Sequence, residues 1–127
     1  MKNYSWFLLF ILSLQNINAQ QSFIDSLKQI VNRHKEDTTG ANALTLLSSQ
    51  VSDPEERITY ANQGLALSKK INYKKGEANC NLVLASLYSQ NGYFIQAIQY
   101  ALAALESYET LKDNTGIASA HLMLQAN

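Results

Sequence analysis

The chain has few of the residues that interrupt helices or cross-link small domains. Among its 127 residues there is one proline, Pro54, and one cysteine, Cys80. A lone proline at the start of an apolar-periodic segment leaves every helix interior intact. One thiol excludes an intramolecular disulfide and a thiolate metal cluster. We predict that Cys80 is a small apolar residue in a helix–helix contact, with an intermolecular disulfide as the alternative.

The sequence also lacks an excess of charge of either sign. Ten Lys and Arg residues balance ten Asp and Glu residues, so the formal net charge is zero. Such a chain has no field that attracts nucleic acid or an anionic membrane surface, and we expect no nucleic-acid partner. The hydrophobic fraction of 46% is that of a globular protein and argues against disorder.

Motifs of catalytic or cofactor chemistry are missing as well. The sequence contains no GxxxxGK, GxGxxG or GxSxG, and His34 and His121 lie far apart and outside any HExxH spacing. Paired acids such as Glu55 and Glu56 stand at helix starts, where the helix dipole favours carboxylates. We therefore predict no catalytic residue, no metal and no cofactor. A hydrolase that uses Glu and His is the remaining enzymatic alternative.

The N-terminus has the layout of a secretory signal peptide. Lys2 precedes an apolar run over residues 4–14, and residues 15–19 are polar and end in a small residue. This layout predicts cleavage between Ala19 and Gln20. The apolar run is about half of the roughly 20 residues that a membrane-spanning helix needs, so an uncleaved anchor is less favoured. We expect an exported chain, periplasmic in a bacterium or secreted, with no direct membrane binding after cleavage.

In the rest of the chain apolar residues recur at helical spacing, and no alternating strand pattern occurs. Six helices are predicted, over residues 22–34, 40–51, 54–71, 76–90, 94–111 and 116–127. Asp53 is predicted to cap the third of these helices, with Pro54 as its first residue. Lys74 and Lys75 are assigned to a break and to a solvated role at a helix C-terminus. The predicted fold class is all-α.

A shift of 40 residues superposes one half of this helical region on the other. The matching pairs are Leu44 and Leu84, Leu47 and Leu87, Ile58 and Ile98, Tyr60 and Tyr100, Leu65 and Leu105, and Gly76 and Gly116. A fixed period of this length indicates stacked repeats, each of which buries its apolar face against its neighbours.

Residues 84–105 read Leu-Ala-x-x-Tyr-x-x-x-Gly-x-Phe-x-x-Ala-Ile, then five residues, then Ala-Leu. In order and spacing this segment resembles the tetratricopeptide repeat; HEAT-like and armadillo arrays have a similar period and are the alternatives. The resemblance implies a right-handed solenoid of antiparallel helix pairs. The packing residues that it implies are Leu84, Ala85, Tyr88, Gly92, Phe94, Ala97 and Ala104. Ala101 stands where the family usually has an aromatic residue, and the first unit is degenerate.

These observations predict five segments along the chain. They are a signal peptide (1–19), an amphipathic capping helix (20–36), a degenerate first repeat (37–76), a second repeat (77–116) and the first helix of a third repeat (117–127). No Asp, Glu, Lys or Arg follows Asp113, so the apolar residues of the last helix need a partner. We expect the protein to continue beyond Asn127, with a homodimer through the last helix as the alternative.

The whole layout is similar to the exported N-terminal sensor region of bacterial histidine kinases and other signal-transduction regulators. The resemblance implies a protein or peptide ligand in a concave groove lined by the first helix of each pair. The groove positions are Asn42, Ser49, Gln50, Asn79, Leu82, Ser86, Ser89 and Gln90. This lining is uncharged, which argues against a clamp for a C-terminal carboxylate, whereas its amides suit an extended backbone. A merely solubilising role for these residues is one alternative, and a stand-alone exported scaffold that dimerises is another.

Overall fold

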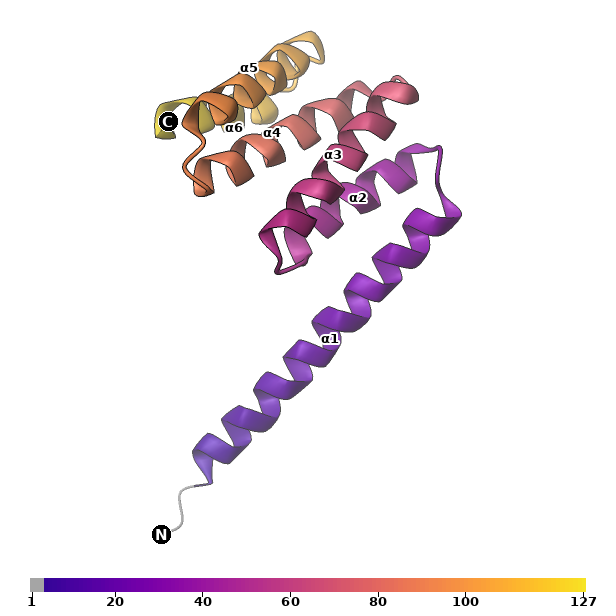
Figure 1. The fold of residues 1–127 in the computed structure, drawn as a ribbon, viewed down its shortest axis with the longest axis vertical. Coiled ribbons are helices and arrows are strands. Elements are labelled where there is room, and N and C mark those ends of the chain that lie inside the picture. Colours follow the sequence, from indigo (N-terminus) through magenta and orange to yellow (C-terminus); the bar gives the residue numbers. More distant parts are fainter. Residues whose placement is uncertain (1–3) are drawn as a thin grey trace.

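The computed structural model describes residues 4–127, which form six α-helices and no strand. The helices are α1 (Ser5–Arg33), α2 (Thr38–Gln50), α3 (Pro54–Lys70), α4 (Lys74–Gln90), α5 (Phe94–Thr110) and α6 (Asn114–Ala126). From α2 onward successive helices pack side by side and reverse direction at each turn (Figure 1). The predicted all-α class is confirmed. Lys2, the predicted positive residue of the signal peptide, lies outside the described residues.

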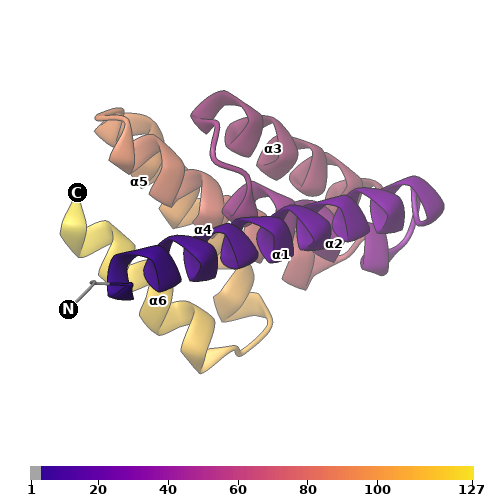
Figure 2. The same ribbon diagram turned by 90° about the horizontal axis from the view of Figure 1, so that it is seen from below.

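α1 is a single unbroken helix where the sequence predicted a signal segment followed by a new helix at Ser22. That start is wrong, because no proline or glycine interrupts the chain before Arg33. Ile24 and Leu27 are the buried residues of α1 and pack with Leu47 of α2. Residues 5–23 are exposed, and the N-terminal end of α1 projects away from the other helices in Figure 1, whereas Figure 2 views the molecule from below, with α1 in front. No helix of the described chain combines the length and hydropathy that crossing a membrane requires.

Three turns of the stack repeat one backbone geometry at intervals of 20 residues. Asn72, Gly92 and Lys112 have φ angles of 55°, 80° and 55°. In each turn the following amide donates back to a carbonyl of the preceding helix, as from Tyr93 to Tyr88 at 2.9 Å. This is the Schellman ending of a helix, in which a left-handed residue reverses the chain. α3, α4 and α5 each have 17 residues, so the 40-residue sequence period consists of two equal half-units.

Aspartates cap the N-termini of α2, α3 and α6. Asp53 caps α3, as predicted, and its carboxylate accepts a hydrogen bond from the Glu56 amide at 3.2 Å. The sequence did not identify Asp37 and Asp113, which cap α2 and α6 in the same way. Because of these two caps, each of those helices begins two residues before the predicted first residue.

α4 begins at Lys74, inside the segment that was predicted as a break. Lys74 and Lys75 therefore lie at a helix N-terminus, not at a C-terminus as predicted, and the helix dipole is unfavourable to cations there. Ion pairs offset this position: Lys74 contacts Glu77 at 3.2 Å, and Lys75 is paired with Asp113. The predicted repeat boundaries, after residues 76 and 116, accordingly fall within the first turns of α4 and α6.

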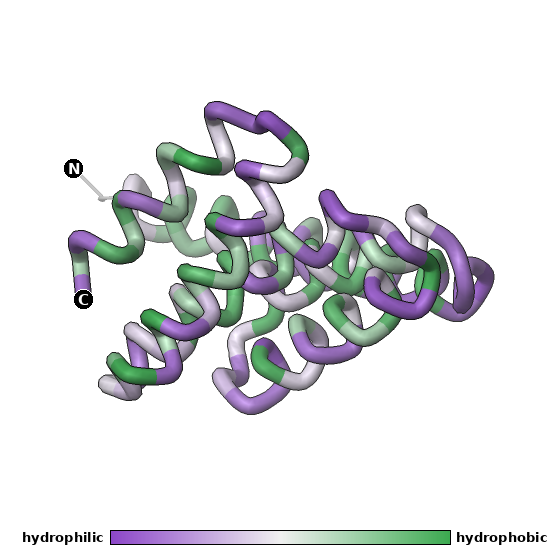
Figure 3. Tube along the Cα trace, turned by 90° about the horizontal axis from the view of Figure 1, so that it is seen from above, coloured by the Kyte–Doolittle hydropathy of each residue, from purple (hydrophilic) through white to green (hydrophobic). Residues whose placement is uncertain are grey.

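Small and apolar residues occupy the contacts between helices, and hydrophilic residues are interspersed on their outer sides (Figure 3). Leu84, Ala85, Ala97 and Ala104 have no exposed surface, as the repeat resemblance implies. Phe94 is an exception because it is 53% exposed, so its predicted packing role is wrong.

The two sides of the stack differ in how closely the helices approach. α4 contacts α2 and α6 on one side, whereas no Cα atom of α3 lies within 8 Å of one in α5. We call the side formed by α2, α4 and α6 the inner face, and the side formed by α3 and α5 the outer face. The gap between α3 and α5 lies on the outer face.

The three equivalent turns allow a matched set of substitutions. Lys112→Gly is expected to raise the free energy of unfolding by about 1 kcal/mol, because glycine adopts positive φ without Cβ repulsion. Gly92→Ala should lower it by about 1 kcal/mol, and Asn72→Gly should change it less, since asparagine tolerates this conformation. Urea unfolding followed by circular dichroism measures all three. If the three substitutions changed the free energy of unfolding by the same amount and in the same direction, the assignment of a shared turn would be contradicted.

Candidate functional site

The residues predicted to line a binding groove lie on two helices of the inner face. Asn42, Ser49 and Gln50 belong to α2, whereas Asn79, Leu82, Ser86, Ser89 and Gln90 belong to α4. Because α2 and α4 contact each other, the fold brings the two groups to neighbouring helices.

Two of these residues accept hydrogen bonds from tyrosines of neighbouring elements. The Tyr73 hydroxyl donates to the Asn42 side-chain oxygen at 3.3 Å, and the Tyr108 hydroxyl donates to that of Asn79 at 2.8 Å. The first bond joins α2 to the turn before α4, and the second joins α4 to α5. Both amide oxygens thus already contribute to contacts between elements.

The other groove positions are more varied. Ser89 donates to the Asn127 side chain at 2.7 Å, and Leu82 packs against the cluster that contains Tyr108. Ser86 and Gln90 bond to each other within α4 at 3.0 Å. A ligand can replace such an intrahelical bond, so Ser86 and Gln90 are the most available polar groups of α4 on this face.

A charged cluster supports the bond between Tyr108 and Asn79. Tyr108 is buried, and this burial, together with the nearby Asp113 carboxylate, raises the pKa of Tyr108 to about 12. The hydroxyl therefore stays protonated and remains a donor. Lys75 lies over the Tyr108 ring, 5.1 Å from its centroid, and is paired with Asp113. The pKa of Asp113 is lowered, mainly by the hydrogen bond from Lys75 and to a smaller extent by that from the Gly116 amide.

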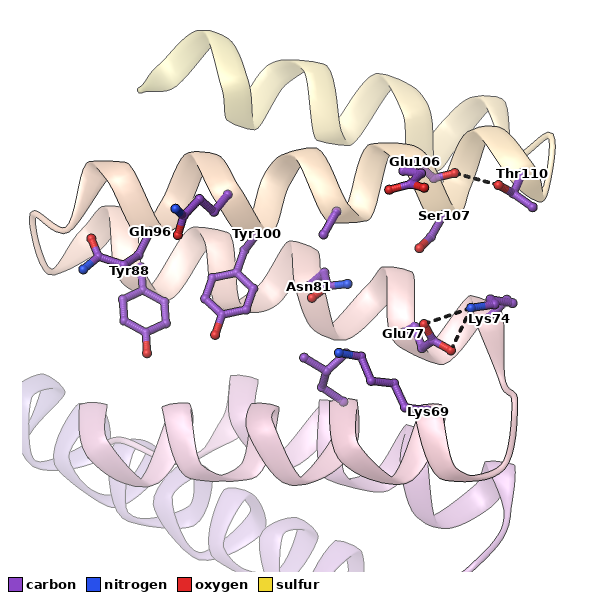
Figure 4. Close-up of a pocket in the computed structure, with 13 residues that line it drawn as sticks. Lys69, Lys74, Glu77, Asn81, Tyr88, Gln96, Tyr100, Glu106, Ser107 and Thr110 are labelled. Carbon is purple, nitrogen blue, oxygen red and sulfur yellow. Dashed lines mark hydrogen bonds and ion pairs between the residues drawn. The ribbon is translucent and has the colours of Figure 1, made fainter.

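A cavity of about 560 Å³ opens on the outer face, in the gap between α3 and α5. α4 forms its floor, and none of the predicted groove residues lines it. The lining includes Leu65 and Lys69 of α3, Lys74, Glu77, Asn81 and Tyr88 of α4, and Gln96, Tyr100, Glu106 and Thr110 of α5 (Figure 4). Its volume is in the range of ligand-binding clefts.

The cavity has an aromatic end and a charged end. Tyr88 and Tyr100 stack at the aromatic end, with ring centroids 5.3 Å apart and an interplanar angle of 13°. The pKa of Tyr100 is raised, mainly by burial and to a smaller extent by the proximity of Tyr88, so its hydroxyl stays protonated. At the charged end Glu77 is buried, and Lys74 donates to both of its carboxylate oxygens at 3.2 Å.

Asn81 lies on the floor of the cavity and was not identified from the sequence. It is 6% exposed, and its side chain has no hydrogen-bond partner among residues 4–127. A sequence signal was present: Asn81 is three residues after Ala78 and four before Ala85, and therefore lies on the buried stripe of α4. A polar amide within such a stripe is unusual.

Cys80 lies in the interior between α3 and α4, as predicted. It has no exposed surface, and its sulfur is 3.2 Å from the Thr45 hydroxyl. Burial raises the pKa of the Cys80 thiol, which disfavours the reactive thiolate and therefore the alternative of an intermolecular disulfide. Within the described part of the chain, no group of three or more His, Cys, Asp or Glu residues is placed to hold a metal ion.

Comparison with known proteins does not assign the chain to a family. No protein-family model, curated protein or solved structure matches it. The tetratricopeptide resemblance therefore depends on the residues of the chain itself.

The pairing of Asp113 with Lys75 predicts a pH dependence of stability. The pKa of Asp113 is lowered in the folded chain, so its contribution is fully present above the unfolded value of about 3.9 and is lost as pH falls through the folded value. Asp113→Asn retains a capping oxygen but removes the charge. We expect a lower Tm near pH 6 and a smaller loss of Tm between about pH 4.5 and pH 2.

Thermal unfolding at stepwise pH, followed by circular dichroism, measures this difference. Glu109→Gln is the control, because Glu109 is an exposed acid near the end of α5, four residues before Asp113, and forms no ion pair within residues 4–127. If Tm changed with pH in parallel for Asp113→Asn and the unsubstituted chain, the pair of Asp113 with Lys75 would not contribute to the pH dependence of stability.

Proposed function

We propose that this chain is a non-catalytic protein-interaction module of the tetratricopeptide type, folded as a right-handed solenoid. The observation that carries the proposal is the half-unit of 20 residues, repeated with the same turn geometry at Asn72, Gly92 and Lys112. In repeats of this kind each unit packs only against its neighbours, which leaves two long faces for a partner.

The partner that we propose is a protein or peptide with an uncharged contact segment. The eight groove residues on α2 and α4 include no Asp, Glu, Lys or Arg, which supports recognition by hydrogen bonding rather than by ion pairing. Ser86 and Gln90 are the residues of α4 that we assign to this contact, since they bond only to each other. Nucleic acid is not part of the proposal, because the net charge of the chain is zero.

We also propose that residues 1–19 are removed on export and that the remaining chain acts in the periplasm or outside the cell. Gln20 is the first residue of α1 that hydrogen-bonds to another helix, through its side-chain amide to the Gln50 carbonyl at 3.2 Å. Residues 5–19 are exposed, so cleavage after Ala19 removes no buried contact. The exported chain would then serve as the sensor region of a signal-transduction protein.

The N-terminus of the exported chain tests this part of the proposal. After expression in a Gram-negative host, the periplasmic fraction should contain a chain that begins with Gln20, as read by intact mass and N-terminal sequencing. Ala19→Arg should prevent cleavage because the processing site requires a small residue, whereas Ser22→Ala should be cleaved normally. A full-length chain in the cytosol for all three forms would rule the export proposal out.

A second candidate is a stand-alone scaffold that dimerises through α6. Leu122 on this helix is 67% exposed, and exposed apolar residues often mark interfaces. Sedimentation velocity separates the candidates: a dimer that Leu122→Glu dissociates favours the scaffold, whereas a monomer favours the interaction module.

The binding proposal is tested with a library of random 12-residue peptides displayed on phage. Selection on the full-length chain should enrich peptides that bind reversibly in solution. Ser86→Arg should weaken binding at the inner face by about tenfold, because a long cation replaces a small residue beside the groove. Asn62→Leu on α3 is the control and should leave the Kd unchanged. If selection on the chain enriched no peptide beyond a control selection without the chain, the proposed function would be rejected.

A further inference from the structure

The strongest unassigned feature is the buried amide in the outer-face cavity. Asn81 is more than nine-tenths buried and lines the cavity, yet no described residue hydrogen-bonds to its side chain. Buried polar side chains in folded proteins almost always have a partner. The amide atoms of Asn81 remain open to the cavity, so water or a ligand, and not another described residue, completes their hydrogen bonds.

We infer that the outer-face cavity binds an extended polypeptide segment, whose backbone peptide group pairs with the Asn81 side chain. The Asn amide has a carbonyl acceptor and NH donors, which match the N–H and C=O of a peptide group. The inference rests on the proposed protein-binding function and adds a second contact, on the face opposite the predicted groove.

The length of the cavity and its amide favour an extended chain over a helix. Lining residues on α4 run from Lys74 to Tyr88, which corresponds to about 21 Å along a helix, or about six extended residues. The backbone N–H and C=O groups of an α-helix are already paired within the helix, so a helix offers no free peptide group to Asn81, whereas an extended segment does.

The lining also indicates which side chains the segment carries. Tyr88 and Tyr100 form an apolar and aromatic surface at one end, suited to an aromatic or aliphatic side chain. From α3, Lys69 extends along the cavity toward Asn81, and it has no carboxylate within 4.0 Å among residues 4–127 (Figure 4). An acidic residue of the bound segment would pair with it. The ligand is thus a segment with an apolar residue and, farther along, an Asp or Glu.

The first repeat provides an internal comparison. The residue equivalent to Asn81 there is Ala41, which is fully buried and has no polar side chain. The corresponding cavity, lined by residues of α1, α2 and α3 that include Tyr60, has a volume of about 280 Å³. Tyr60 is the repeat equivalent of Tyr100. The larger cavity and its amide are therefore properties of the second repeat and not of the repeat architecture in general.

The test uses the full-length chain and peptides selected on it from the random 12-residue library. Asn81→Leu keeps the approximate volume of the side chain and removes its hydrogen-bonding groups, so the Kd of outer-face peptides should rise at least tenfold. Asn62→Leu, the same change at an exposed position of α3, should leave the Kd within twofold. The selected peptides should contain an apolar residue followed or preceded by an acidic one, and Lys69→Gln should weaken their binding.

A spectroscopic measurement keeps the test decisive if Asn81→Leu does not fold. In the unsubstituted chain, saturating peptide should shift the ¹H–¹⁵N resonances of the Asn81 side-chain amide. If Ser86→Arg weakens the binding of the selected peptides and these peptides leave the Asn81 resonances unchanged, they bind at the inner face. That result would overturn this inference and leave the proposed function intact. A gain of helical circular dichroism in the bound peptide would contradict the extended mode. The absence of any enriched peptide would reject both proposals.

Discussion

Close packing of successive helices through small residues is the constraint on which the rest of this structure depends. Gly64 of α3 lies so near α4 that a Cβ atom on it would be 3.0 Å from the Cys80 sulfur. Gly116 is closer still to its neighbour, since a Cβ atom there would lie 2.1 Å from the Tyr108 ring. Larger side chains at these positions would force the helices apart or displace the ring. The spacing of the helices, and hence the shape of both faces, follows from these contacts.

The central position of α4 connects packing to binding. On the inner face it contacts α2 and α6, and its side chains there hold neighbouring helices, as the bond between Asn79 and Tyr108 shows. On the outer face α3 and α5 remain apart, and α4 is the floor of the cavity between them. Two asparagines of this helix therefore differ: Asn79 is hydrogen-bonded to Tyr108, whereas Asn81, two residues later, faces the cavity without a hydrogen-bond partner among residues 4–127.

Much of the fold was predictable because it depends on local patterns. The all-α class, the cap at Asp53 and the burial of Ala85 and Ala97 follow from helical periodicity and from the need for small residues at close contacts. The caps at Asp37 and Asp113 were missed although a capping aspartate is a local signal, since the following glycine looked like the start of each helix. Phe94 was misassigned because family spacing does not specify which way a first-turn side chain points.

By itself, the sequence determined the helices and their repeat, since both depend on which residues recur at fixed spacing along one chain. It also determined the uncharged character of the eight predicted groove residues on α2 and α4. Only the tertiary structure decided that Lys75 pairs with Asp113, and that the gap between α3 and α5 opens onto Asn81. The physical reason is that both features depend on distances between helices, and these distances result from the packing of residues far apart in the sequence.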